Sequence, residues 1–308
     1  MNKQEAISIL KEHKQEHVIK RLEALGDDAA KKLISQVAMI DWKVVESIKD
    51  KAEDKGDAKK IEPLAAVEIN DIKKNKEKYT AKGVEAIKNG KVAAVLLAGG
   101  QGTRLGLDKP KGTLNVGVNK DLFLFGQLIH NLMDVVNQTG AWVPLYIMTS
   151  DKNNKDTVEF FEEHNYFGYD KDYVKFFIQS MVPSVDYNGK LYMESTDSLA
   201  MSPNGNGGWF LSLIAAGLDK DMQDKGIEYV NVFAVDNILQ RIADPAFIGA
   251  TILAGAECGS KVVRKCEPAE KVGVMCRVNG HPSIIEYYEM SEELASLRRE
   301  DGELTYGF

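Results

Sequence analysis

The chain has 308 residues, 44% of them hydrophobic and 28% charged, and only three of them are cysteines. This balance excludes a wholly disordered chain, and the length suits one large domain or about two domains. The formal net charge of −7 argues against a general binder of nucleic acids or anionic membranes, so neither partner is expected. A phosphate ligand is still allowed, because it needs only a local positive pocket.

The cysteines and the hydropathy pattern bear on the compartment. Cys258, Cys266 and Cys276 are odd in number and form no C-x-x-C pair, which indicates structural thiols. No apolar run reaches the roughly 18–20 residues that a membrane span requires, and the first residues show no apolar signal core. The expected location is a reducing cytoplasm.

Residues 1–85 are predicted to form an N-terminal helical segment, because apolar residues recur there at helical spacing. His13 and His17 lie one helical turn apart, a spacing that could hold a metal. No carboxylate partner is apparent, and the stretch is dense in Lys and Glu. A solvated helix face is therefore the preferred interpretation of this pair.

Residues 86–308 are predicted to form a nucleotide-binding α/β domain. Short apolar runs alternate with helical stretches, which favours a mainly parallel sheet that binds ligands at the carboxyl ends of its strands. Asp121 is the expected N-cap of the first long helix, and Gly140 is its expected end. The expected strands cover 92–97, 143–148, 174–179 and 229–235, with a later pair at 272–278 and 283–288 around Asn279-Gly280.

A glycine-rich loop after the first of these strands carries the strongest chemical signal. It reads LAGGQGTRLG over 97–106 and is followed by Lys109-Pro110-Lys111-Gly112. Glycines let backbone N–H groups approach a phosphate chain closely, while Arg104 and Lys111 add positive charge. The pattern therefore predicts a polyphosphate cradle in preference to a plain strand-to-helix turn.

Two better-known glycine loops do not fit this stretch. A P-loop requires G-x-x-x-x-G-K-[ST], but Gly106 is followed by Leu107. A dinucleotide fingerprint requires G-x-G-x-x-G, and Leu105 stands where the third glycine belongs. An NAD(P)-dependent oxidoreductase is accordingly disfavoured.

Two further loops could complete a nucleotide pocket. The segment 201–208 reads MSPNGNGG and precedes an expected helix, so it offers flexible backbone, amide groups and a helix N-terminus. Asp236 follows the apolar strand 229–235, and a carboxylate there is a natural Mg²⁺ ligand beside a polyphosphate loop. A simple helix cap is the alternative role for Asp236.

These segments together resemble the UTP-dependent sugar-1-phosphate uridylyltransferases, and most of all UDP-N-acetylglucosamine pyrophosphorylases of the eukaryotic type. The similarity runs from about Val92 to the end of the chain. It implies a Rossmann-like nucleotidyltransferase fold (GT-A-like), with a mixed, mainly parallel sheet flanked by helices. It also implies that UTP and a sugar 1-phosphate are converted to a UDP-sugar and pyrophosphate with Mg²⁺ as cofactor. The sugar 1-phosphate that the resemblance favours is N-acetylglucosamine 1-phosphate.

The resemblance also assigns roles to individual residues. Arg104 and Lys111 would bind the UTP phosphates and act in catalysis, and Asp236 would hold the metal beside the nucleotide. The remaining assignments are uridine and phosphate contacts for Leu97, Ala98, Gly99 and Gly100, uracil contacts for Gln179 and Gly205, a sugar contact for Asn206, and sugar-phosphate contacts for Glu286 and Tyr287.

The chain departs from the family pattern in two places. Asn204 replaces a common Asp, and the family continues well past the position of Phe308 with a second metal-side residue, a phosphate-binding Lys and a small β domain. A C-terminally truncated member is therefore expected. Two alternatives stay open: an enzyme for UTP and glucose 1-phosphate or for a broad range of UDP-sugars, and a noncatalytic nucleotide-sugar binding protein. The sequence does not indicate the oligomeric state.

Overall fold

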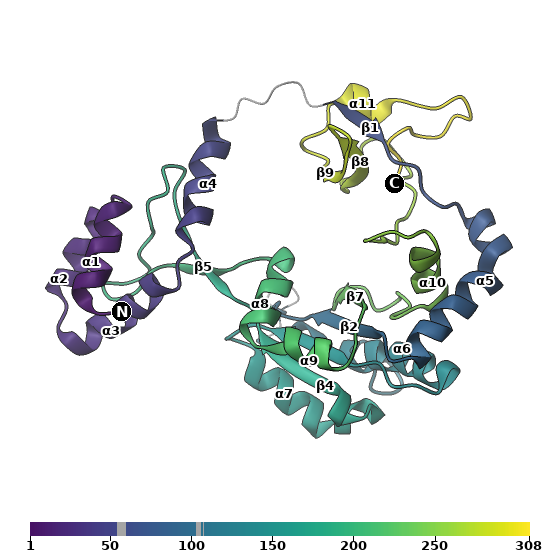
Figure 1. The fold of residues 1–308 in the computed structure, drawn as a ribbon, viewed down its shortest axis with the longest axis horizontal. Coiled ribbons are helices and arrows are strands. Elements are labelled where there is room, and N and C mark those ends of the chain that lie inside the picture. Colours follow the sequence, from purple (N-terminus) through teal and green to yellow (C-terminus); the bar gives the residue numbers. More distant parts are fainter. Residues whose placement is uncertain (54–59, 103–105, 107) are drawn as a thin grey trace. The chain divides into compact units, whose positions relative to one another are not determined.

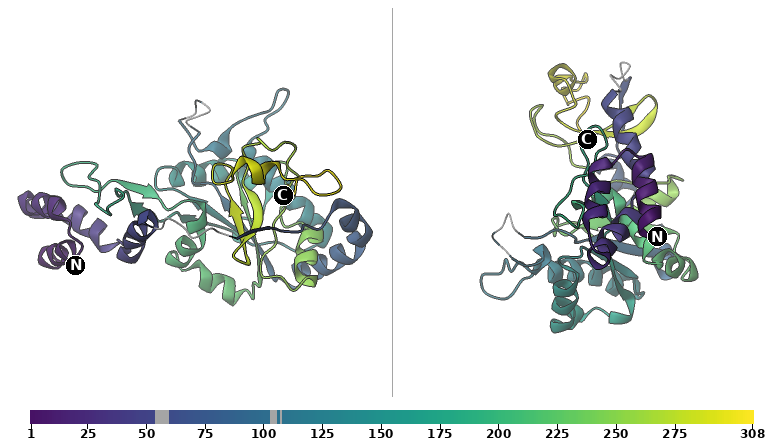
Figure 2. Two further views of the ribbon diagram at one scale, coloured as in Figure 1. Left: turned by 90° about the horizontal axis from the view of Figure 1, so that it is seen from above. Right: turned by 90° about the vertical axis from the view of Figure 1, so that its left-hand side faces the viewer.

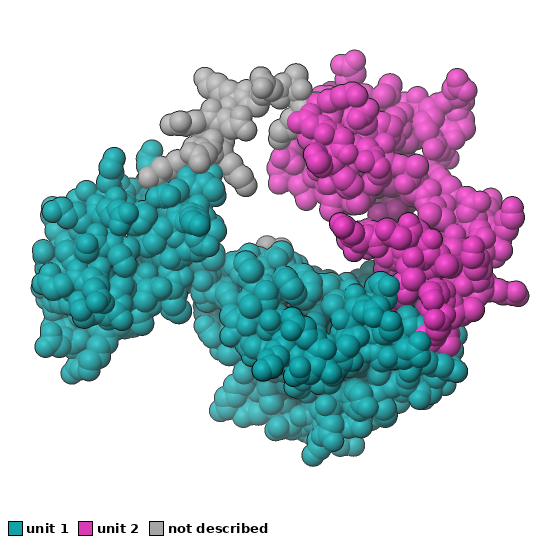
Figure 3. All heavy atoms as spheres, in the orientation of Figure 1, with its two compact units in different colours: residues 1–54, 86–244 teal, residues 55–85, 245–308 magenta. Residues whose placement is uncertain are grey.

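The computed structural model describes residues 1–53, 60–102, 106 and 108–308. These residues form two compact units, each built from two stretches of chain. Unit 1 comprises 1–54 and 86–244, and unit 2 comprises 55–85 and 245–308, as coloured in Figure 3. The chain passes from unit 2 to unit 1 between residues 85 and 86, where a boundary was predicted. The predicted division of the whole chain into 1–85 and 86–308 stays a prediction.

A four-stranded parallel sheet forms the centre of unit 1. Its strand order is β4-β3-β2-β7 (Figure 1). The strand that comes first along the chain, β2, therefore lies between β3 and β7. The apolar runs of the two middle strands, β3 and β2, are buried because a parallel sheet is covered on both faces, whereas the two edge strands are only partly buried. The strands are β2 (Val92–Leu97), β3 (Leu145–Thr149), β4 (Val174–Ile178) and β7 (Tyr229–Ala234).

Helices cover the sheet, which confirms the predicted α/β class with a parallel sheet flanked by helices. Side chains alternate along each strand, so Ala93 and Val95 on one face pack with Leu213 and Met222 of two short helices. Phe161 contacts Phe176 of β4 with ring centroids 5.5 Å apart. The covering helices are α6 (Leu124–Thr139), α7 (Asn154–Glu163), α8 (Trp209–Ala215) and α9 (Leu218–Asp224).

The N-terminal helices of unit 1 pack against a distant hairpin. Leu10 and Leu33 are fully buried in a cluster with Leu191 and Leu199, which lie in the excursion between β5 (Met181–Pro183) and β6 (Met201–Pro203). Figure 2 shows this ribbon extending from the sheet to the helices. The helices are α1 (Lys3–Glu12), α2 (Glu16–Ala24), α3 (Asp27–Ala38) and α4 (Trp42–Glu53).

Unit 2 contains a three-stranded antiparallel sheet of order β1-β8-β9. The predicted hairpin is confirmed: Asn279 and Gly280 both adopt positive φ at its turn, as a tight two-residue turn requires. The strand β1 was not expected from the sequence. The elements are β1 (Ile61–Pro63), β8 (Val274–Val278), β9 (His281–Ile285), α5 (Ile69–Lys88), which continues into unit 1, α10 (Pro245–Leu253) and α11 (Glu292–Ser296).

The start of α6 corrects one prediction. Phe123, and not Asp121, occupies the N-cap position, and it makes no side-chain capping bond. Asn115 and Phe123 pair as an antiparallel bridge before the helix, and the Asp121 carboxylate accepts a hydrogen bond of 2.7 Å from Asn115. The end of α6 is as predicted, because Gly140 adopts the left-handed conformation there. In the described part of the chain, no helix has the length and apolarity to cross a membrane.

Candidate functional site

The predicted nucleotide residues of unit 1 lie at the carboxyl ends of its parallel strands. Leu97 ends β2, Gln179 follows β4, and Asp236 follows β7. Because β2 lies beside both β3 and β7, the loops after these strands emerge at the same edge of the sheet. This edge is where open α/β sheets bind their ligands.

The glycine loop after β2 folds back on itself. Gln101 pairs with Pro110 as an antiparallel bridge, and the Lys111 N–H donates to the Gly100 carbonyl over 3.4 Å. This pairing brings Lys111 back toward the end of β2. Arg104, the other predicted phosphate ligand, lies outside the described residues.

Gln179 brings the two glycine-bearing loops together. Its side-chain nitrogen donates a hydrogen bond of 2.7 Å to the carbonyl oxygen of Gly205, and its side chain is only 6% exposed. A Cβ at Gly99 would lie 2.9 Å from Gln179 Oε1, so the loop comes close to this buried amide at a glycine. Gly205 has φ +76°, a conformation that also favours glycine. Three predicted uridine contacts thus meet in one place.

Lys111 and Asp236 form an ion pair between the loops that follow β2 and β7. The Lys111 side chain is 30% exposed and that of Asp236 is 62% exposed, so both charges remain accessible to a ligand from solvent. Asp236 does not cap a helix: no helix begins at the residues that follow it. The ion pair therefore places a cation and a carboxylate side by side at the predicted phosphate position.

Asn206 begins a short 3₁₀ helix, Asn206–Gly208, that leads directly into α8. It is exposed and lies next to Gly205, so the predicted sugar contact adjoins the predicted uracil contact. Gly208 packs against the side chain of Asn204, where a Cβ would come within 2.1 Å of side-chain atoms. A larger residue at position 208 would require the Asn204 side chain to move.

Glu286 and Tyr287 belong to unit 2 and follow β9. The Glu286 carboxylate lies beside Gly273, and Tyr287 is 43% exposed and packs edge-to-face against Tyr288. Their predicted role in the sugar-phosphate pocket stays a prediction.

Asn153 is a buried polar residue at this edge that the sequence analysis did not identify. Its side-chain nitrogen donates to the carbonyl oxygens of Ala98 (2.9 Å) and Gly100 (3.3 Å), and its side-chain oxygen accepts from the Ser150 N–H (2.7 Å). The available signal was an Asn at the N-cap of α7, in the short turn that follows the buried strand β3. That position predicts a helix cap, but this side chain makes no capping bond to its helix.

A charged cluster supports the sheet away from these loops. Asp221 accepts hydrogen bonds from Tyr146 (2.6 Å), Lys175 (2.6 Å) and Lys225 (2.5 Å). Burial alone would raise the pKa of Asp221, but the hydrogen bonds from the two lysines and Tyr146 outweigh it and hold the pKa well below its usual range. Burial and the bond to Asp221 raise the pKa of Tyr146.

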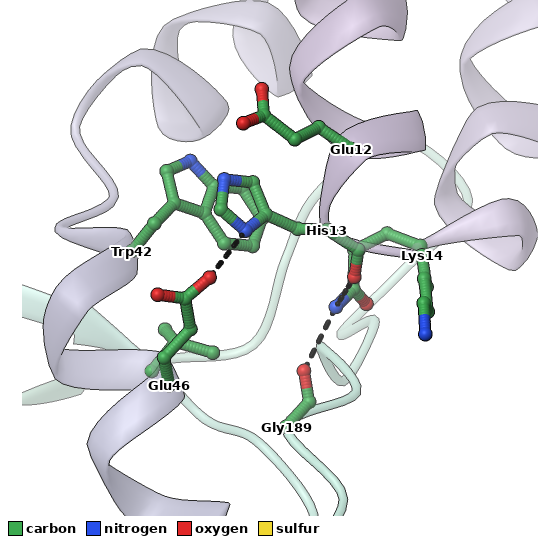
Figure 4. Close-up of a pocket in the computed structure, with 8 residues that line it drawn as sticks. Glu12, His13, Lys14, Trp42, Glu46 and Gly189 are labelled. Carbon is green, nitrogen blue, oxygen red and sulfur yellow. Dashed lines mark hydrogen bonds and ion pairs between the residues drawn. The ribbon is translucent and has the colours of Figure 1, made fainter.

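A separate cavity of about 150 Å³ lies between the N-terminal helices and Gly189 of the excursion between β5 and β6 (Figure 4). His13 stacks on Trp42 with ring centroids 4.0 Å apart and lies 3.1 Å from the Glu46 carboxylate, so it does have a carboxylate partner, contrary to the sequence analysis. His17 instead contacts the Leu191 carbonyl at 2.7 Å. The described residues contain no cluster of three potential metal ligands.

Comparison with known proteins identifies relatives over most of the chain. A family model described as UTP–glucose-1-phosphate uridylyltransferase matches residues 28–301. A human UDP-N-acetylhexosamine pyrophosphorylase-like protein 1 is 45% identical over 237 residues, covering 75% of this chain and 47% of the human protein. A UDP-N-acetylglucosamine pyrophosphorylase from Saccharomyces cerevisiae is 42% identical over 238 residues, covering 76% of this chain and 50% of the yeast protein.

A solved structure shows the same fold. The uridine diphosphate N-acetylglucosamine pyrophosphorylase from Trypanosoma brucei, crystallised with an inhibitor, superimposes with a TM-score of 0.84 at 29% identity. The match covers 100% of this chain and 65% of the trypanosomal chain. The chain spans about half the length of the curated relatives named above.

Proposed function

The chain belongs to the UTP–glucose-1-phosphate uridylyltransferase family, and from this premise we propose that it transfers a uridylyl group from UTP to a sugar 1-phosphate. The products are a UDP-sugar and pyrophosphate. We propose N-acetylglucosamine 1-phosphate as the sugar substrate, because the yeast and trypanosomal relatives are named for UDP-N-acetylglucosamine.

The convergence of two glycine-bearing loops on Gln179 carries the proposal. Gly99 and Gly205 lie against opposite atoms of the same amide group, and the proposed position of uracil is beside this amide, where the two loops meet. The glycine loop leads from there to Lys111, whose ammonium lies beside Asp236. A base-binding amide followed by a positive group is the order that a nucleoside triphosphate needs.

The proposed chemistry is a direct displacement. A phosphate oxygen of the sugar 1-phosphate attacks the α-phosphorus of UTP, a new P–O bond forms, and the bond to the β-phosphate oxygen breaks as pyrophosphate leaves. The protein contributes by positioning the two substrates and by placing positive charge where negative charge develops. Lys111 supplies such charge, and Arg104 is proposed to supply more.

Asp236 fits a role as ligand of a Mg²⁺ ion bound together with the nucleotide. Its carboxylate is more than half exposed and already lies beside a positively charged group. Magnesium commonly takes one or two protein carboxylates and completes its shell with phosphate oxygens and water, so a single Asp suffices. When bound, the ion would neutralise phosphate charge. Lys111 would then turn from the carboxylate to the phosphates.

We propose that the reaction takes place in the cytoplasm. Three free cysteines, two of them exposed, support a reducing compartment. The expected partners are UTP and a sugar 1-phosphate, and the net charge of −7 gives no reason to add nucleic acid or an anionic membrane.

Calorimetry with UTP, followed by a pyrophosphate-release assay, tests the proposal. UTP should bind, and the release of pyrophosphate should depend on Mg²⁺. Among N-acetylhexosamine 1-phosphates and hexose 1-phosphates, N-acetylglucosamine 1-phosphate should give the fastest release. Asp236→Asn should abolish the Mg²⁺ dependence of binding, whereas Asp224→Asn on the exposed side of α9 should not. Binding without turnover would favour the noncatalytic alternative. No UTP binding would refute both.

A further inference from the structure

Asn153 holds the glycine loop by every hydrogen bond that its side chain can donate. An asparagine amide has two N–H donors, and here they reach the carbonyl oxygens of Ala98 and Gly100. The amide oxygen accepts from Ser150, which closes the turn that carries Asn153 itself. The residue is fully buried, so water does not compete for these bonds.

These bonds set the direction of two peptide groups. In a trans peptide, the carbonyl oxygen and the next N–H point to opposite sides. With the carbonyls of Ala98 and Gly100 drawn toward Asn153, the N–H groups of Gly99 and Gln101 point away from it. Among the described residues, the N–H groups of Gly99, Gly100 and Gln101 donate to no protein acceptor. Unpaired N–H groups on neighbouring residues are the donors that bind phosphate oxygens.

We propose that Asn153 is a positioning residue that orients the peptide groups of residues 98–101 for binding the phosphates of UTP. The inference rests on the proposed function of the site. It accounts for an N-cap residue that makes no capping bond to its own helix, since its side chain is turned to the loop instead. It also connects this loop to Lys111, because the Gly100 carbonyl accepts from both Asn153 and the Lys111 N–H.

The test uses two variants of the 308-residue chain that keep the shape of the side chain. Asn153→Asp removes both donors and adds a charge, and Asn153→Leu removes them without a charge. Calorimetry measures UTP affinity, and an NMR titration measures the affinity for uridine, which lacks phosphates. We expect the UTP dissociation constant to rise about tenfold or more in both variants, the effect of losing buried hydrogen bonds, and uridine affinity to fall by a smaller factor than UTP affinity.

Gln15 provides the matched control. It is also buried, and its amide also bridges backbone groups, with its nitrogen 2.8 Å from the Gly189 carbonyl and its oxygen 3.0 Å from the Leu191 N–H. It lies among the N-terminal helices. Gln15→Glu and Gln15→Met should therefore lower thermal stability and leave both affinities unchanged.

The outcomes separate the inference from the function on which it rests. If the unmodified chain does not bind UTP, the proposed function is refuted and the inference with it. If it binds UTP and both Asn153 variants bind UTP as tightly, only the inference is refuted. An effect confined to Asn153→Asp would indicate charge repulsion, and an equal loss of UTP and uridine affinity would indicate general unfolding; either result overturns the positioning role.

Discussion

The side-chain nitrogen of Gln179 donates a hydrogen bond of 2.7 Å to the carbonyl oxygen of Gly205, and Gly99 lies against the oxygen of the same amide. The buried side chain of Gln179 therefore sets the distance between two loops that are about a hundred residues apart in sequence. The width of the proposed uracil site depends on this amide, because either loop would have to move if the amide moved.

Gly99→Ala and Gly100→Ala should differ in a way that tests this arrangement. A Cβ at position 99 would lie 2.9 Å from Gln179 Oε1, whereas a Cβ at position 100 would meet no protein atom within 4 Å. We expect Gly99→Ala to lower both the melting temperature and the UTP affinity. Gly100→Ala should keep the melting temperature and lose only UTP affinity, because its methyl group would meet the phosphates. Thermal melts and calorimetry distinguish the two, and equal melting temperatures for the two variants would contradict the packing argument.

Lys111→Gln should weaken triphosphate binding without a large loss of stability. Its ion pair with Asp236 is partly exposed, and such pairs contribute about 0–1 kcal/mol to folding. A phosphate contact from a lysine at a partly desolvated site is expected to contribute more, about 1.5–3 kcal/mol, or a loss in affinity of about tenfold or more. Calorimetry with UTP measures this effect. Lys152→Gln, an exposed lysine after β3, serves as control, and an equal effect of the two variants would indicate only bulk charge.

Asp221→Asn should destabilise unit 1 by about 2 kcal/mol at neutral pH, since charged hydrogen bonds from two lysines are lost. The folded-state pKa of Asp221 is depressed below that of the unfolded chain, which is about 3.9. The stabilisation is therefore fully present above about pH 4 and is lost as the pH falls through the lower, folded-state value. The stability difference between the parent and the variant should stay constant from pH 5 to 8 and shrink below pH 4.

Urea denaturation at several pH values measures that difference. Asp224→Asn, an exposed carboxylate on the same helix, is the control and should change stability by less than about 0.5 kcal/mol. A difference for Asp221→Asn that grows on acidification would show that the ionised carboxylate is not the stabilising form.

Gly249→Ala should loosen the packing of α10 on α5 in unit 2. A Cβ at position 249 would lie 1.8 Å from the Tyr79 carbonyl oxygen and 2.8 Å from the Gly83 nitrogen. These are backbone atoms, so the helices themselves must separate, at a cost of about 1–3 kcal/mol. Hydrogen exchange should become faster in both helices. Gly26→Ala is the control: its Cβ would meet nothing within 4 Å, so hydrogen exchange in α5 and α10 should stay as slow as in the parent chain. Unchanged hydrogen exchange in Gly249→Ala would contradict the close approach of the two helices.

Local patterns predicted most of the secondary structure. The apolar run 92–97 forms β2 because continuous apolar residues suit a strand that is covered on both faces, and Gly140 ends α6 because it tolerates a positive φ. Asp121 was misassigned because its carboxylate is used by Asn115 across a bridge that precedes the helix. The strand β1 was missed because only three residues pair with β8, too few for a periodic signal.

The sequence by itself predicted which segments would bind phosphate, because glycines and cations at a strand end act through local backbone geometry. Only the tertiary structure decided that Lys111 meets Asp236, that Gln179 joins Gly99 to Gly205, and that Asn153 reaches back to Ala98. Each of these contacts depends on the strand order β4-β3-β2-β7. That order is set by how whole elements bury their apolar faces against one another, so it cannot be read from any single stretch of sequence.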